Sequence, residues 1–505
     1  MSQEPEPRVV FGPRDQHGLI LGLRVGQIGI LLCGVLLALG AITASQANPL
    51  AILAVLALAV LSGAAALMPV GGRGVDEWVP MVIRHLLGHP ATWRSTQPSR
   101  GQRVSAGPTG EPRLIPAQPS FPPMLRHCSV LAVPVPRGEL GVVRDTQLGT
   151  WTAVLRVRGS SFALLDSSEK ARRMAAWGVA QAALAHHGTP VSALQVVIRS
   201  TVADPDAIAH HVAERHTVDL RSPVLRSYLA LVDDAAPVTQ AQDVHVAVQL
   251  SLARARRAIR QAGGGDQGAG AVLARQLQLL QLQMERADIR VDGALPPRLL
   301  AQTLRESWNP ATVSQLRLAA PLSRRDPESE GVDPSGAGPL YARRGWRWYE
   351  TDSALHVSYW ISEWPRRPVS LDYLIPLVLQ AGATARVSVC MQPVDPVSAR
   401  RDLETARTQH LADEQLRRRH GFRTSVEVHR QSETVERRES EFADGHAEFR
   451  FCGHITVSAE SVSELETACG HVEEQARASC LDIRRMDGEH DLGFAATLPL
   501  ARGIW

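Results

Sequence analysis

The feature that most constrains this chain is a pair of apolar segments near its N-terminus. Residues 25–44 (VGQIGILLCGVLLALGAITA) and 49–70 (PLAILAVLALAVLSGAAALMPV) carry no charge, and only the polar stretch 45–48 separates them. A helix needs about 20 apolar residues to cross a hydrocarbon core of about 30 Å. We therefore predict a transmembrane helical hairpin. A buried hairpin in a globular protein is the alternative, because long apolar runs also form core helices.

The charges beside the two segments predict how the hairpin is oriented. The connection 45–48 is uncharged, whereas arginine residues lie on both outer sides of the hairpin, at Arg8, Arg14, Arg24, Arg73, Arg84, Arg94, Arg100 and Arg103. Positively charged flanks favour the cytoplasmic side of a membrane. The sequence thus predicts a multi-pass protein of the plasma membrane that contacts the lipid bilayer and has both termini in the cytoplasm.

Length and composition limit the classes of function. A chain of 505 residues has room for two or three domains beyond the hairpin. The net charge is only +3, and a nucleic-acid-binding protein normally gathers basic residues on one surface, so we predict no direct contact with nucleic acid. The six cysteines form no CxxC pair and are expected to be free thiols.

The remaining patterns predict an α+β fold: a two-helix transmembrane hairpin followed by cytoplasmic mixed α/β domains. Strands are expected to come in groups and not to alternate strictly with helices. The expected parts are a tail, hairpin and juxtamembrane helix over 1–94, a linker over 95–123, a first domain over 124–321, a linker over 322–340 and a second domain over 341–505.

Individual elements follow from hydrophobic periodicity and from helix start signals. Strands are expected over 152–157, 194–198, 244–250, 385–391, 448–457 and 481–485, and a pair of strands over 346–360. Helices are expected over 167–187, 204–216, 223–232, 270–286, 397–420 and 461–478, with a short helix or buried strand over 371–379.

No motif for catalysis is present. A nucleotide-binding P-loop requires a lysine directly after its last glycine, whereas the only lysine, Lys170, follows Glu169. The glycine-rich run 263–268 is expected to be a loop between helices, and the sequence contains neither GxSxG nor HExxH. We predict no catalytic residue, no cofactor and no metal, and hence no enzyme.

Three groups of polar residues leave alternatives open. His85 and His89 are spaced to share a metal on one helix face, or to contact lipid headgroups. His446, Cys452 and His454 are close in sequence, and core packing is favoured over a metal site. The run Arg417–Arg419 could cap a helix C-terminus, or bind acidic lipid or a partner.

Two regions of the sequence resemble components of conjugative, type IV secretion-like systems. PRVVFGPRDQHGLILGLRVGQ, followed by the apolar segments and PVGGRGVDEWVP, resembles the amino-terminal membrane region of actinobacterial PrgI-type integral membrane proteins. GELGVVRDTQLGTWTAVLRVRGSSFALLD, ERRESEFADGHAEFRFCGHITVSAESVSELETACGHVEEQARA and GFAATLPLARG are similar to the amino-terminal, non-catalytic domain of CagE/TrbE-type transfer ATPases. The chain stops at Trp505, where the nucleotide-binding domain of those ATPases would begin.

The resemblance implies a non-catalytic inner-membrane scaffold that docks a separate transfer ATPase and other membrane subunits of the secretion system. Homo-oligomerisation is left open. The alternatives are an EccE-like membrane subunit of type VII secretion, and a membrane-tethered enzyme with an unrecognised site.

Two further expectations concern aromatic residues. Trp346, Trp348, Tyr349, Trp360 and Trp364 form either a hydrophobic core or an exposed docking face. The C-terminal residues 498–505 either provide the port for the ATPase or fold back onto their own sheet.

Overall fold

The structure of the protein is a computed structural model. It describes residues 8–9, 11, 25–44, 57, 63–64, 74–87, 92–95, 103–106, 112–115, 120–136, 138–158, 162–202, 222–235, 240–313, 330–379, 384–401, 403–405, 407–408, 437, 440–441 and 446–503. The chain divides into two compact units, one formed by residues 13–90 and the other by residues 1–12 together with 91–505. Each unit is considered by itself.

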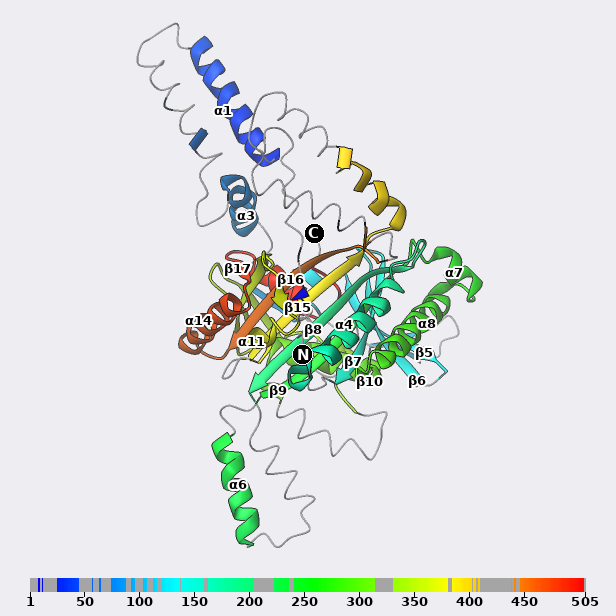
Figure 1. Cartoon of the computed structure of the whole chain (residues 1–505). Coiled ribbons are helices and arrows are strands. Elements are labelled where there is room, and N and C mark those ends of the chain that lie inside the picture. Colours follow the sequence, from blue (N-terminus) through cyan, green and yellow to red (C-terminus); the bar gives the residue numbers. More distant parts are fainter. Residues whose placement is uncertain are drawn as a thin grey trace, which may run out of the picture. The chain divides into compact units, whose positions relative to one another are not determined.

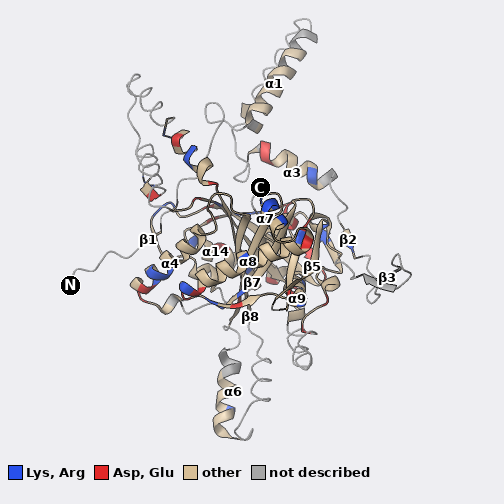
Figure 2. Ribbon diagram, turned by 90° about the vertical axis from the view of Figure 1, so that its right-hand side faces the viewer, with Lys and Arg blue, Asp and Glu red and all other residues tan. Residues whose placement is uncertain are grey.

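In the smaller unit, the first predicted apolar segment forms helix α1 (Val25–Ala44). This helix contacts α3 (Val75–Leu87), which begins with two acidic residues, and Figure 2 shows the contrast between the uncharged α1 and the acidic start of α3. A methyl group placed on Gly26 would lie 2.6 Å from Cβ of Asp76, so the two helices approach closely at this glycine.

The prediction of a transmembrane hairpin is wrong. A hairpin requires two continuous apolar helices of about 20 residues each. The second predicted segment, 49–70, lies outside the described residues except for Ala57, Gly63 and Ala64. Within the described part of the chain, no helix combines the length and the apolar character needed to span a bilayer. This finding also overturns the predicted multi-pass location in the plasma membrane with two cytoplasmic termini.

The larger unit is built around one antiparallel sheet of 13 described strands (Figure 1). The order along the sheet is β2-β11-β12-β13-β16-β15-β8-β9-β7-β6-β5, with β17 paired to β13 and β10 paired to β7. The strands are β2 (Thr92–Arg94), β5 (Cys128–Val135), β6 (Gly138–Asp145), β7 (Thr150–Arg158), β8 (Val191–Val202), β9 (Gln240–Ser251), β10 (Arg290–Ala294), β11 (Tyr341–Arg344), β12 (Tyr349–Thr351), β13 (Ala354–Glu363), β15 (Thr384–Pro393), β16 (Phe449–Ala459) and β17 (Asp482–Arg485).

Helices of this unit begin and end largely where local signals place them. They are α4 (Ser167–Ala182), α6 (Pro223–Ala235), α7 (Arg256–Gln261), α8 (Gly265–Arg286), α9 (Pro297–Trp308), α11 (Ile375–Val378), α14 (Val462–Ala478) and α15 (His490–Thr497). The Asp166 side chain caps α4 by accepting from the Glu169 amide, and Ser461 caps α14 in the same way through Glu464. Between α7 and α8 the chain turns through Gly263 and Gly264, which both have positive φ angles that favour glycine.

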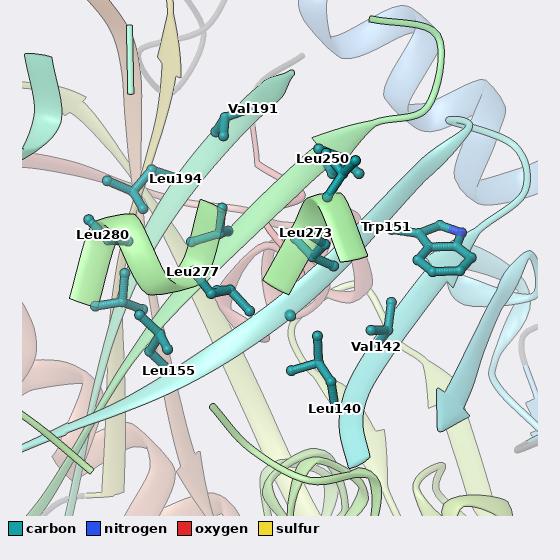
Figure 3. Packing of buried hydrophobic residues seen from close by; sticks show 14 of the residues in the cluster. Leu140, Val142, Trp151, Leu155, Val191, Leu194, Leu250, Leu273, Leu277 and Leu280 are labelled. Carbon is teal, nitrogen blue, oxygen red and sulfur yellow. The ribbon is translucent and has the colours of Figure 1, made fainter. Parts of the chain in front are cut away.

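One face of the sheet is apolar and is covered by helices. Alternate residues of the central strands are valine and leucine, and they pack against α8 over the first half of the sheet. Figure 3 shows Leu273, Leu277 and Leu280 of α8 directed at Leu155, Leu194 and other strand residues. Over the second half, Val357, Tyr359 and Ile455 pack against α14.

The opposite face is covered by α9 and α15. Their aromatic residues Trp308 and Phe494 lie in a further core cluster with Val154 and Ala247, which point to this side of β7 and β9. The ring centroids of Trp308 and Phe494 are 4.6 Å apart. The sheet is therefore the middle layer of three.

Short segments from the N-terminal part of the chain complete the larger unit. β1 (Arg8–Val9) pairs with β14 (Val369–Ser370), and β2 pairs with β11. Phe11 stacks on Trp364 and contacts Phe451, with centroids 5.3 and 6.2 Å apart. Within the range expected to be a linker, β3 (Arg103–Ala106) pairs with β4 (Pro112–Ile115).

The observed fold class is a mixed α/β protein dominated by a large antiparallel sheet. The ranges 124–321 and 341–505, expected as two domains, both contribute strands to this sheet, because β8 pairs directly with β15. The helix expected over 204–216 lies outside the described residues, as do residues 409–436, which include the second half of the expected helix 397–420. In the first half of that range, the described residues 397–401, 403–405 and 407–408 are helical.

Candidate functional site: the C-terminal segment on the polar face of the sheet

The face of the sheet under α15 is lined with polar side chains. Residues that are directly opposite each other on paired strands point to the same face. Across β9, β8, β15, β16 and β13, this rule places together Gln249, Gln195, Ser388, His454, Thr456, Ser358, His245, Arg199, Arg386 and His356. Buried polar groups are costly unless they are hydrogen-bonded, so this layer requires partners.

The C-terminal segment 498–503, which directly follows α15, supplies many of these partners. Leu498, Leu500 and Ala501 of this segment are buried. Gln195 lies at the centre: its Nε2 donates to the carbonyl oxygen of Ala496 at 2.8 Å, and its Oε1 accepts from the Ala501 amide at 2.6 Å. The side chain of one strand residue therefore satisfies a carbonyl near the end of α15 and an amide of the segment.

Neighbouring side chains also form hydrogen bonds with the backbone of the segment. Gln249 Nε2 donates to the carbonyl oxygens of Leu500 and Ala501 at 3.4 and 3.3 Å. The Thr152 hydroxyl donates to the Leu500 carbonyl at 3.3 Å. These bonds go to the main chain of the segment, which bends at residues 498–500 and has a positive φ at Ala501. The polar face therefore holds a bent stretch of backbone, while Leu498 and Leu500 pack into the adjoining core cluster.

The end of the segment is held by an ion pair and a thiol. The Arg502 guanidinium lies 3.2 Å from the buried carboxylate of Asp145 and also donates to the Met124 carbonyl at 2.7 Å. The Cys452 thiol donates to the Gly503 carbonyl. The segment is thereby connected to β6 and β16, which are separated by β15, β8, β9 and β7 in the sheet order.

An ionic cluster occupies the same face towards the C-terminal end of β8. Arg199 bridges Asp243 at 2.7 Å and Glu306 at 2.6 Å. Arg386, which is directly opposite Arg199, is only 3% exposed, and its guanidinium lies 4.5 Å from the Phe494 ring. Both terminal amino groups of Arg386 lack a hydrogen-bond partner among the described residues. Burial and the nearby Arg199 lower the pKa of Arg386 to about 9.

Burial holds the imidazoles and thiols of this face in their neutral forms. It lowers the pKa of His245 and of His454 to about 4, and places the pKa of His356 well below its usual range. It raises the pKa of Cys452 to about 12. None of these groups is thus activated as a nucleophile or poised as a base near neutral pH. What the arrangement does chemically is bind the backbone of residues 496–503 by hydrogen bonds.

The residues singled out from the sequence are not brought together at this site, with one exception. His85 lies on α3 in the smaller unit, whereas His89 and Arg417–Arg419 lie outside the described residues. Cys452 and His454 share the polar face of β16. No group of three or more metal-ligating side chains that could hold a metal ion is found within the described ranges.

The aromatic group of the second half agrees with the core alternative. Tyr349 is buried, with its ring centroid 5.5 Å from that of Phe494, while Trp348 and Trp364 pack against the core cluster under α14. Trp346 and Trp348 precede the short strand β12, which pairs with β13 within the range 346–360.

The C-terminal segment folds back onto its own sheet as far as Gly503, the second of the two alternatives for this end of the chain. Residues 504–505 lie outside the described part.

Sequence reasoning missed Gln195, Gln249, Asp145 and Arg502. The available signal was partial alternation: Gln195 and Arg199 of β8, and Asp243, His245 and Gln249 of β9, recur at even spacing, interrupted by Val197 and Ala247. Such a pattern is ordinarily taken as a strand with one face in water. A polar face that is buried under a distant segment gives the same pattern.

In comparisons with known proteins, no family model and no curated protein matches this chain.

Proposed function

We propose that this chain is a non-catalytic docking subunit of a conjugative or type IV secretion-like transfer apparatus, and that it binds a separate transfer ATPase. The sequence resemblance supports this function, since it covers strand and helix patterns of a non-catalytic ATPase domain. The C-terminal segment is engaged by its own sheet, so the docking surface lies elsewhere. The observation that carries the proposal is an apolar surface on α4 and α8.

Helices α4 and α8 lie side by side over the sheet and run antiparallel (Figure 1). Arg173 near the start of α4 pairs with Asp288 just beyond the end of α8 at 2.7 Å. On their outer surfaces, Val179 of α4 is 62% exposed and Leu282 of α8 is 55% exposed. The solvent side of a surface helix is normally polar, and exposed apolar patches mark interaction sites.

The pattern on α8 favours a helical partner with acidic residues. Arg275, Leu279, Leu282 and Arg286 follow each other at helical spacing and are all exposed, so an apolar stripe lies between two arginines. On α4, a methyl group added to Gly178 would contact nothing within 4 Å, which leaves room for close approach. We therefore assign this surface to a helix of the ATPase with an apolar stripe flanked by carboxylates.

The test is copurification of the full chain with each CagE/TrbE-type ATPase of its source organism, produced together in one host. Wild type is expected to retain an ATPase, and Val179→Glu combined with Leu282→Glu is expected to reduce the retained amount about tenfold or more, since burying two carboxylates in an apolar interface costs well over 1.4 kcal/mol. Val462→Glu, the same change at an exposed position of α14, is the matched control and should retain the ATPase.

Circular dichroism and thermal unfolding check that the double variant is folded. Full retention by a folded double variant would show that docking does not use α4 and α8. Hydrolysis of ATP by the purified full chain alone, without retention of any ATPase, would overturn the docking function itself.

A further inference from the structure

Two cysteines face each other where the C-terminal segment ends. Cys390 on β15 and Cys452 on β16 are directly opposite in the antiparallel register, and they belong to one buried cluster with Ala193 and Ala501. The other four cysteines, Cys33, Cys128, Cys469 and Cys480, have no cysteine opposite them in any strand pair. Opposed residues of antiparallel strands have Cα atoms about 4.5–5.5 Å apart, within the 4.4–6.8 Å that disulfides span.

The final described residue of the segment rests on this pair. A methyl group placed on Gly503 would lie 3.3 Å from Cβ of Cys390 and 3.6 Å from Sγ of Cys452. The thiol hydrogen of Cys452 is donated to the Gly503 carbonyl oxygen. Any reaction that removes this hydrogen also removes the bond that holds Gly503.

We propose that Cys390 and Cys452 are an oxidation site that closes to a cross-strand disulfide and thereby loosens the C-terminal segment at Gly503. The oxidant is a hydroperoxide. The half-exposed Cys452 sulfur attacks the peroxide as a thiolate and becomes a sulfenic acid, and the O–O bond breaks to release hydroxide or alkoxide. The Cys390 sulfur then displaces hydroxide from the sulfenic acid, which forms the S–S bond.

In total, two thiols lose two electrons and two protons, and hydrogen peroxide is reduced to two molecules of water. Cys452 is the first sulfur to react because it is the more exposed of the two. The raised pKa of the Cys452 thiol makes this reaction slow near neutral pH, and its rate should increase about tenfold per pH unit from pH 7 to 9 as the thiolate fraction rises.

The disulfide itself is tested in the full chain with Cys33→Ser and Cys480→Ser, because these two other accessible thiols would compete for peroxide. After treatment with hydrogen peroxide and blocking of free thiols in denaturant, peptide mapping is expected to give a peptide pair joined through Cys390 and Cys452, with the loss of two hydrogen atoms. Mapping that finds both residues as blocked free thiols would overturn the proposal.

Two variants test the order of the reaction. In Cys390→Ser, the sulfenic acid on Cys452 has no partner and is expected to be trapped by dimedone. Cys469→Ser, a buried cysteine on α14, is the matched control and should form the same disulfide as its parent. Dimedone labelling of Cys452 in the parent equal to that in Cys390→Ser would show that Cys390 does not resolve the sulfenic acid.

Release of the segment is measured by hydrogen exchange. The Ala501 amide, which donates to Gln195, is expected to exchange at least tenfold faster in the disulfide form than in the reduced form, while amides of β8 and β9 keep their rates. Unchanged exchange at Ala501 would show that the disulfide forms without loosening the segment, and that part of the proposal would be wrong.

Discussion

The amide of Ala501 donates a hydrogen bond of 2.6 Å to the side-chain oxygen of Gln195, a residue 306 positions earlier in the chain. This bond joins the last segment of the protein to the middle strand pair of its sheet. Both residues are buried, so the bond is not replaced by water when it is lost.

Replacing Gln195 with leucine tests how much this face contributes to stability. The change removes the donor to the Ala496 carbonyl and the acceptor for the Ala501 amide, and leaves both backbone groups buried. The Ala496 carbonyl still accepts from the Ser388 hydroxyl at 3.0 Å, so only the Ala501 amide is left without this partner. We expect the free energy of unfolding in urea to fall by about 1–3 kcal/mol, the cost of one orphaned buried group. Gln278→Leu, at an exposed position of α8, is the control and should change it by less than about 0.5 kcal/mol.

Substitutions of Arg502 and Asp145 are expected to have coupled effects on the free energy of unfolding, because the two side chains form an ion pair. Arg502→Met leaves the buried Asp145 carboxylate without its cation and should cost about 3 kcal/mol. In combination with Asp145→Asn, the cost should be less than the sum of the two single changes, as a double-mutant cycle would measure. Additive effects would mean that the two side chains do not interact in solution.

Two opposed arginines should respond in opposite directions to the same substitution. Arg199→Met removes the buried cation that pairs with Asp243 and Glu306, and is expected to destabilise by about 3–5 kcal/mol. Arg386→Met removes a buried charge whose terminal amino groups have no hydrogen-bond partner among the described residues, and is expected to be neutral or stabilising by about 1–4 kcal/mol. Denaturant unfolding of both variants decides this, and a large loss with Arg386→Met would reveal an anion that pairs with it.

Stability should fall as pH decreases through the range below the usual histidine pKa. Burial lowers the pKa of His245 and His454 to about 4 in the folded state, so below a pH of about 6.5 the unfolded chain binds protons that the folded chain does not. Each histidine should cost up to about 1.4 kcal/mol per pH unit between about 6.5 and 4. Urea unfolding at pH 7, 6 and 5 measures this slope.

His245→Gln provides the control for the pH effect. A glutamine does not titrate, so this variant should lose part of the slope between pH 6.5 and 5. A slope identical to wild type in His245→Gln would mean that His245 is already protonated in the folded protein.

What the sequence by itself determined are the elements whose signals are local. The alternation in 152–157 predicted β7, the start signal at residues 167–169 with helical spacing after it predicted α4, and the pattern over 461–478 predicted α14. These elements depend on side-chain periodicity and capping within a few residues, so they can be predicted without the rest of the chain. The transmembrane hairpin was inferred from hydropathy alone, and that inference was wrong.

Only the tertiary structure decided how these elements share one sheet and what covers its polar face. The pairing of β8 with β15 joins strands almost 200 residues apart. No local signal specifies which distant strand pairs with a given strand. The polar residues Gln195 and Gln249 have the spacing of a solvent-exposed strand face, and they are buried because α15 and residues 498–503 return to satisfy them. Their role depends on the partner that the fold provides, and that partner is not encoded near them in the sequence.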